Sequence, residues 1–298
     1  MSQLKNKYYQ NLLIQLLGIP IPAVVLTIIL LKNNVPVFEV FQSYSTSENA
    51  DIQLPIFGAM FLFASTLIIY AIDFLRDIAF WKKSGMAIPK FGKLLASGYV
   101  ILGFVVIIGL VITMIKNGEA KMILVGDALK GFLNGYTAAI VVFIGIFVIV
   151  KNSTRKYVSI FTPFIIAIVA SLSVFAPIYL ISGLEGFKWM NDLVQPITSY
   201  FLLFVANVIT VSFFEKDKDT EGNTQNIWNT HESLAKAIVF VVPTLMILLH
   251  WFFHWNIQQH SIFFVFAIYL FMYYFPAFFK KASVYRIVID LALLLVCI

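Results

Sequence analysis

Two pairs of acidic residues share one spacing that could bind a metal ion. Asp73 and Asp77 are four residues apart, and so are Glu215 and Asp219. On a continuous helix this spacing places both carboxylates of a pair on one face. Oxygen ligands of this type suit Mg²⁺, which is usually held by one or two carboxylates together with water and substrate phosphates. The pairs therefore predict a magnesium site that handles a phosphate group.

A charge-balanced, solvated loop is the competing interpretation of these acids. Lys216 and Lys218 alternate with the acids of the second pair, and a single acidic pair is weak support for a site. The position of the pairs favours a function. Asp73 follows directly after one long apolar stretch, and Glu215 follows directly after another.

Apolar stretches that could cross a bilayer make up most of the chain. Of the 298 residues, 60% are hydrophobic and 12% are charged, and the mean hydropathy is +0.90, which excludes a soluble globular protein. Cys297 is the only cysteine, so a disulfide-stapled scaffold is excluded as well. We expect an all-α polytopic membrane protein with a single domain over residues 1–298. Its nine transmembrane helices should lie near 11–31, 54–72, 94–115, 133–150, 157–182, 193–214, 234–254, 260–279 and 283–298.

Basic residues between these stretches predict the orientation of the bundle. With the N-terminus in the cytoplasm, all but five of the 21 Lys and Arg residues fall on the cytoplasmic side, as the positive-inside rule requires. They form no patch, so nucleic acid is not an expected partner. The last span is short and contains Arg286 and Asp290, which leaves open an eight-span chain with an interfacial tail. We expect a multi-pass protein of the cell (inner) membrane.

The acidic pairs occupy matching places in this topology. They follow the second and the sixth span, both at the cytoplasmic side. Because these spans are four apart, their helices run in the same direction, which predicts a parallel internal repeat of spans 1–4 and 5–8. Acidic residues at the cytoplasmic end of an apolar, aromatic-rich helix bundle suggest a substrate with a diphosphate head and a hydrocarbon tail.

At these motifs the chain resembles the UbiA superfamily of intramembrane prenyltransferases. That family carries Asn-x-x-x-Asp-x-x-x-Asp after its second helix and Asp-x-x-x-Asp after its sixth. Asp73 and Asp77 match the aspartates of the first motif, while Glu215 and Asp219 match the second. Ile69 stands where the family has Asn, and the basic stretch 151–156 is only loosely similar to the family's Lys-Arg segment. The resemblance is therefore to a divergent member.

The resemblance implies a transferase that uses Mg²⁺ and acts within the lipid bilayer. Such an enzyme moves a polyprenyl group from its diphosphate to a lipophilic acceptor, at a site on the cytoplasmic side. Catalytic and metal-binding roles would fall to Asp73, Asp77, Glu215 and Asp219. The substrate-binding candidates are Arg76, Lys82, Lys83, Arg155, Lys156, Asn207 and Tyr70.

The aromatic and amide candidates each have a second interpretation. Tyr70, Tyr200 and Phe213 could stabilise an allylic cation, but ordinary packing is the commoner role of any single ring. Asn207 lies two turns before Glu215 and could contact the substrate or make an interhelical hydrogen bond.

Two other functions compete with a prenyltransferase. A transporter with a parallel repeat would need ionisable residues near the bilayer midplane, where the first eight spans have almost none. A catalytically inactive relative is supported by Ile69, and retention of both acidic pairs argues against it.

Overall fold

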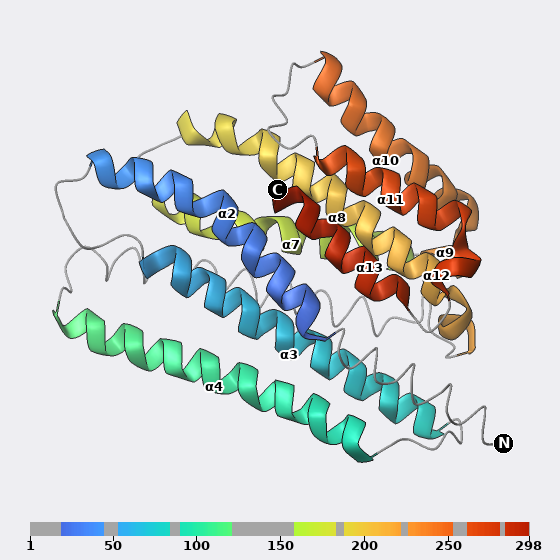
Figure 1. Ribbon diagram of the computed structural model, residues 1–298, viewed down its shortest axis with the longest axis horizontal. Helices are drawn as coiled ribbons and strands as arrows, with labels where there is room; N and C mark the ends of the chain where they lie inside the picture. The colour runs from blue at the N-terminus through green and yellow to red at the C-terminus, as the bar shows by residue number, and fades with distance from the viewer. Residues whose placement is uncertain are drawn as a thin grey trace. The chain divides into compact units, whose positions relative to one another are not determined.

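Helices make up the part of the chain that the computed structural model describes, which is residues 19–44, 53–83, 90–120, 158–182, 188–221, 226–252, 261–280 and 284–297 (Figure 1). No strand occurs among these residues. The helices are α2 (Pro20–Tyr44), α3 (Gln53–Lys83), α4 (Lys90–Ala120), α7 (Val158–Ser182), α8 (Lys188–Glu221), α9 (Ile227–Thr230), α10 (Glu232–Phe252), α11 (Ser261–Tyr274), α12 (Pro276–Phe279) and α13 (Val284–Ala292). A 3₁₀ helix, Leu293–Cys297, follows α13. The expected fourth span, near 133–150, lies outside the described residues.

Three of the described helices are long and apolar enough to cross a membrane. Their apolar segments are Phe91–Leu110, Gln195–Asp217 and Glu232–Phe252. Shorter apolar segments are Pro20–Lys32, Gly58–Ile72, Ile160–Leu172 and Ser261–Tyr274. Each segment overlaps one of the spans expected from the sequence. The fold is therefore that of an all-α membrane protein, while the count of nine spans and the internal repeat stay predictions.

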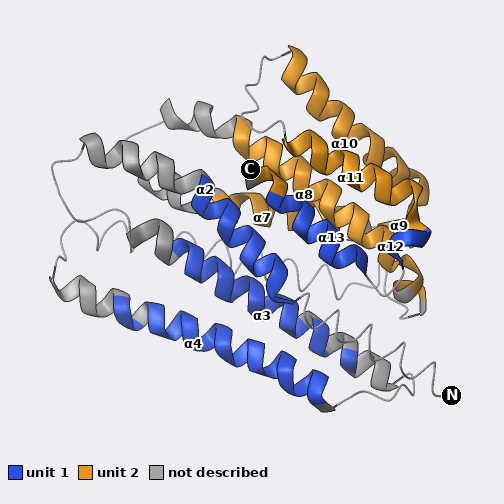
Figure 2. Cartoon of the chain, viewed as in Figure 1, with its two compact units in different colours: residues 1–122, 277–294 blue, residues 123–276, 295–298 orange. Residues whose placement is uncertain are grey.

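The chain divides into two compact units (Figure 2). Unit 1 contains residues 1–122 and 277–294, and unit 2 contains residues 123–276 and 295–298. In unit 1, α3 packs against both α2 and α4, and α13 packs against α2. In unit 2, α7, α9, α10 and α11 all pack against α8.

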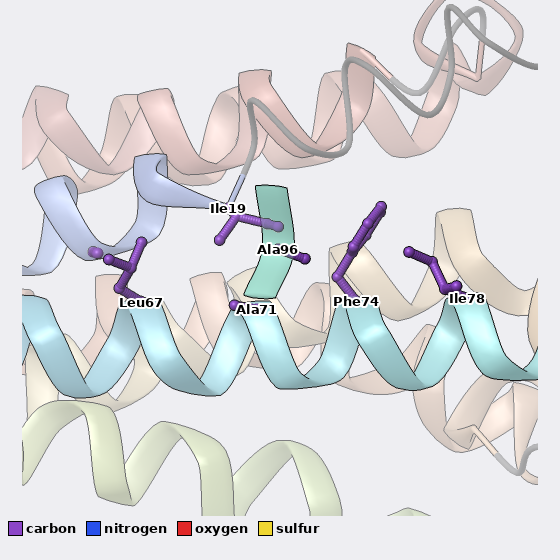
Figure 3. Packing of buried hydrophobic residues seen from close by; sticks show 7 residues of the cluster. Ile19, Leu67, Ala71, Phe74, Ile78 and Ala96 are labelled. Atoms are coloured by element: carbon purple, nitrogen blue, oxygen red, sulfur yellow. The ribbon is translucent and has the colours of Figure 1, made fainter. Parts of the chain in front are cut away.

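The core of unit 1 follows one face of α3. Leu67, Ala71, Phe74 and Ile78 are buried at intervals of three or four residues, as the period of a helix requires (Figure 3). They meet Ile19, Ala23 and Ala96 of the neighbouring segments. The packed face thus continues along α3 past Asp73, the first charged residue after the apolar run of the sequence.

Gly103 lets α4 approach α3 closely. A Cβ atom at this position would lie 2.5 Å from Ile68 Cγ1 and 3.0 Å from the backbone oxygen of Ala64. The same atom at Gly98 or Gly109 would have nothing within 4 Å. Small residues at helix contacts allow this kind of approach in membrane proteins, where dispersion forces hold helices together.

Helix α8 forms the centre of unit 2. In an 18-residue apolar window of α8, 61% of the residues are buried, against 17% in the corresponding window of α4 and 22% in that of α10. The side chains of Tyr200, Leu203 and Ile209 are almost fully buried along it. Because α8 has 34 residues, it is about 51 Å long and exceeds the roughly 30 Å of a bilayer core.

Candidate functional site

The first acidic pair lies on an unbroken helix. Helix α3 runs from Gln53 to Lys83, so it continues beyond its apolar segment through Asp73 and Asp77. This confirms the expected helix, in which residues four apart share a face. The same helix carries the candidates Tyr70, Arg76, Lys82 and Lys83. The ring of Tyr70 is 39% exposed, and the side-chain contacts of the charged residues lie outside the described part of the structure.

The second acidic pair lies on the central helix of unit 2. Helix α8 continues without a break through Glu215 and Asp219 and ends at Glu221. Both side chains are partly buried, whereas Asp217, which points away from their face, is exposed. Glu215 and Asp219 are thus brought one helical turn apart, as their spacing predicts.

Asp219 is held by a residue that follows α8 in sequence. The Nδ2 of Asn226 donates a hydrogen bond of 2.7 Å to Asp219 Oδ2 and another of 2.8 Å to the carbonyl oxygen of Ser212. The Oδ1 of Asn226 accepts a hydrogen bond of 2.7 Å from the backbone N–H of Trp228. Asn226 is only 8% exposed. The carboxylate of Asp219 therefore contacts a side chain that is itself fixed.

The short helix α9 is tied back to α8 by its side chains. Asn226 is the N-cap of α9 and has an extended backbone with φ −128° and ψ 156°. Trp228 Nε1 donates to the carbonyl oxygen of Ile209 at 2.9 Å, and Asn229 Nδ2 donates to that of Lys216 at 2.9 Å. These bonds fix the segment that follows the acidic end of α8.

An aromatic cluster surrounds this end of unit 2, and we define it as Phe213, Trp228, Phe240, Tyr273 and Tyr274. The ring centroid of Phe213 lies 4.9 Å from that of Trp228 and 5.1 Å from that of Tyr273. Trp228 and Tyr273 are stacked at 5.8 Å, and Phe240 meets both tyrosines edge-on. Lys216 Nζ lies 5.3 Å from the centroid of Phe213. The cluster thus already holds one cation against a ring face.

Two other sequence candidates in unit 2 have structural contacts. Asn207 Nδ2 donates a hydrogen bond of 3.1 Å to Tyr269 Oη, which is the interhelical contact expected as one of its two roles. Tyr200 is 1% exposed and packs in the core, with its ring centroid 6.1 Å from that of Phe204.

An apolar groove of about 680 Å³ follows one side of α11. It is lined by Ser261, Phe264, Ala267, Ile268, Phe271 and Leu295. Its volume falls within the range of small-molecule sites, and its walls suit a hydrocarbon chain rather than a polar ligand.

The predicted convergence of the two acidic pairs stays a prediction. The first pair belongs to unit 1 and the second to unit 2. Arg155 and Lys156 lie outside the described residues. Among the described side chains, which do not include those of Asp73 and Asp77, no three histidine, cysteine or acidic groups are gathered as a metal site would require.

Asn226 and Trp228 are the residues that sequence reasoning missed. Neither belongs to a motif with a recognisable spacing, and both lie in the segment between two spans. In the sequence, Asn226 stands two residues before Trp228 and shortly before an apolar helix. An Asn at such a place indicates a helix cap, but it does not indicate a contact with Asp219.

Comparison with protein families, curated proteins and solved structures found no match to this chain.

Proposed function

We propose that this protein is a Mg²⁺-dependent intramembrane prenyltransferase that moves a polyprenyl group from its diphosphate to a lipophilic acceptor. One observation carries the proposal. Helix α8 stays unbroken through the end of its apolar segment, Gln195–Asp217, and presents Glu215 and Asp219 one turn apart, beside an aromatic cluster. An acidic edge next to aromatic and apolar surfaces suits a ligand with a diphosphate head and a hydrocarbon tail.

The donor atoms of the acidic pairs fit Mg²⁺. Asp73, Asp77, Glu215 and Asp219 offer only carboxylate oxygens, which this ion prefers over nitrogen or sulfur ligands. When bound, Mg²⁺ would neutralise the charge that develops on the departing diphosphate. In this proposal, the Arg76, Lys82, Lys83, Arg155 and Lys156 side chains would hold the phosphate oxygens.

The aromatic cluster supports the cationic part of this chemistry. Ring faces attract positive charge, and Lys216 already lies over the face of Phe213 at 5.3 Å. The apolar groove along α11 offers a surface for a hydrocarbon chain in the same unit.

Three alanine substitutions test this function. We expect Asp73→Ala and Asp219→Ala each to abolish Mg²⁺-dependent binding and turnover of a polyprenyl diphosphate, because each removes a ligand of the metal. The matched control is Asp217→Ala, which removes an exposed carboxylate from another face of the same turn of α8 and should leave both properties intact. Binding and turnover are measured in proteoliposomes with Mg²⁺ and with a chelator. The proposal fails if both first variants bind and turn over like the wild type.

A catalytically inactive relative is the second candidate. Ile69, one turn before Asp73, is 44% exposed and cannot bind a metal or donate to a phosphate. In that case the wild type would bind polyprenyl diphosphate in a Mg²⁺- and Asp219-dependent manner but would not turn it over. The same assay separates the two candidates.

A further inference from the structure

We propose that Asn226 is a positioning residue, which holds the Asp219 carboxylate in the orientation that a bound metal ion requires. This inference rests on the function proposed above. It assigns a role to a residue outside both acidic motifs, seven positions after Asp219 in sequence. Carboxylates that bind metals are commonly held by hydrogen bonds from neighbouring side chains, and loss of such a partner weakens metal binding.

The amide of Asn226 has only one orientation that satisfies its surroundings. Its Nδ2 group faces two acceptors, Asp219 Oδ2 at 2.7 Å and the carbonyl oxygen of Ser212 at 2.8 Å. Its Oδ1 faces a donor, the N–H of Trp228. A flipped amide would place its oxygen against two oxygens and its NH₂ against an N–H. The surroundings therefore fix the donor toward Asp219.

The hydrogen bond from Asn226 does not by itself block metal binding. An ionised carboxylate has two oxygens with about four acceptor sites, and this bond takes one of them, at Oδ2. The bond also restrains the Asp219 side chain near the end of α8. Because Asn226 is buried and its amide makes three hydrogen bonds, it restrains Asp219 rigidly.

The two ends of the amide separate a structural role from a positioning role. Oδ1 caps α9, whereas Nδ2 donates to Asp219 and to the carbonyl oxygen of Ser212. Serine caps helices about as well as asparagine. The variant Asn226→Ser therefore keeps the cap acceptor and removes the amide donor. Asn229→Ala is the matched control, because it removes another hydrogen bond from α9 to α8, made to the Lys216 carbonyl oxygen and not to a carboxylate.

The experiment measures Mn²⁺ binding, as a spectroscopic substitute for Mg²⁺, by electron paramagnetic resonance on the purified full chain in detergent. We expect Asn226→Ser to weaken Mn²⁺ binding by about 10- to 100-fold and to change the spectrum of the bound ion. Asn229→Ala should leave affinity and spectrum unchanged. Melting temperature and gel-filtration profile are recorded for each variant, and Asn226→Thr, which also caps, serves as second variant if the serine variant does not run as a single species.

Each result bears on one proposal. If Asn226→Ser binds Mn²⁺ like the wild type while Asp219→Ala does not bind it, the positioning role is wrong and the metal site stands. If Asn226→Ser and Asn229→Ala weaken binding equally, Asn226 acts only through the placement of α9, and the positioning role is again wrong. If Mn²⁺ binding by the wild type does not depend on Asp219, the proposed function fails and the positioning role fails with it.

Discussion

Trp228 is the residue through which α9 is anchored in unit 2. It is 4% exposed, its indole N–H donates to the Ile209 carbonyl oxygen, and its ring lies against those of Phe213 and Tyr273. A buried Trp usually finds a partner for its N–H in this way, so one residue supplies both packing and a hydrogen bond.

The two contributions of Trp228 can be measured separately. Trp228→Phe keeps an aromatic ring but removes the N–H, and we expect it to lower the free energy of unfolding by about 1 kcal/mol. Trp228→Ala removes the packing as well and should cost about 3–5 kcal/mol. Unfolding in detergent micelles titrated with denaturant checks both values. Trp251→Phe is the control, because Trp251 is 74% exposed and should change little. Equal losses of unfolding free energy for Trp228→Phe and Trp228→Ala would contradict separate contributions from packing and from the hydrogen bond.

At the residue scale, the spacing of the acidic residues predicted how a pair lies on its helix, but not which other side chains contact it. The four-residue interval placed Glu215 and Asp219 one turn apart because a helix has a fixed period. No such period relates Asp219 to Asn226, because Asn226 lies beyond the end of α8 at Glu221. Asn207 illustrates the limit, since its sequence position allowed both a substrate contact and the hydrogen bond to Tyr269.

Gly103 is a point of close approach between α3 and α4. At Gly103 a Cβ atom would meet the side chain of Ile68 and the backbone of Ala64, and backbone cannot move aside as a flexible side chain can. The other two glycines of α4 for which surroundings are described, Gly98 and Gly109, face open space. The three positions therefore form a natural comparison within one helix.

Alanine substitution should lower stability at Gly103 but not at Gly98 or Gly109. In the interior of a helix Gly→Ala is favourable by about 1 kcal/mol, so Gly98→Ala and Gly109→Ala should raise stability or leave it unchanged. Gly103→Ala should lower it, because overpacking typically costs about 1–3 kcal/mol. Melting temperatures of the three variants in one detergent check the prediction. Equal stabilisation by all three would show that α4 does not lie against Ala64.

At the element scale, apolar length predicted the helices but not their ends. The long apolar runs gave α3, α4, α8 and α10 in the expected places. Helix α3 continues beyond the apolar run of the sequence that ends at Ile72, and Phe74 and Ile78 pack in the core there. The four-residue helix α9 is too short to show a period in sequence, and side-chain hydrogen bonds cap it and hold it against α8.

Membrane topology is the property of the whole chain that the sequence predicts most directly. The composition and the apolar helices agree on a membrane protein. The last segment is the weakest part of the nine-span arrangement. Nine residues of α13 and five of the 3₁₀ helix extend roughly 24 Å, less than the roughly 30 Å of a bilayer core.

Reporter fusions distinguish nine spans from eight. With the N-terminus in the cytoplasm, nine spans place a reporter after Ile298 outside and one after Lys280 inside, because successive spans alternate in direction. Alkaline phosphatase, active only outside, and green fluorescent protein, fluorescent only inside, report the two locations. Cytoplasmic signals at both positions would show eight spans and a tail on the membrane surface.

At the scale of the molecule, the class of fold could be predicted and the arrangement of its parts could not. Hydropathy and charge predict the number of spans and their orientation, because both are read along the chain. Whether Asp73 and Asp219 meet depends on contacts between residues far apart in sequence, and no local pattern specifies these.

The hydrogen bonds between α9 and α8 also affect the order in which the helices of unit 2 pack during synthesis. Asn226, Trp228 and Asn229 bond to residues of α8 no more than 19 positions earlier. Closing loops this short costs little entropy, so these contacts can form as soon as the ribosome has delivered residue 229 to the translocation machinery. We therefore expect the acidic end of α8 to take its shape during synthesis, and α10 and α11 to dock on a surface that is already built.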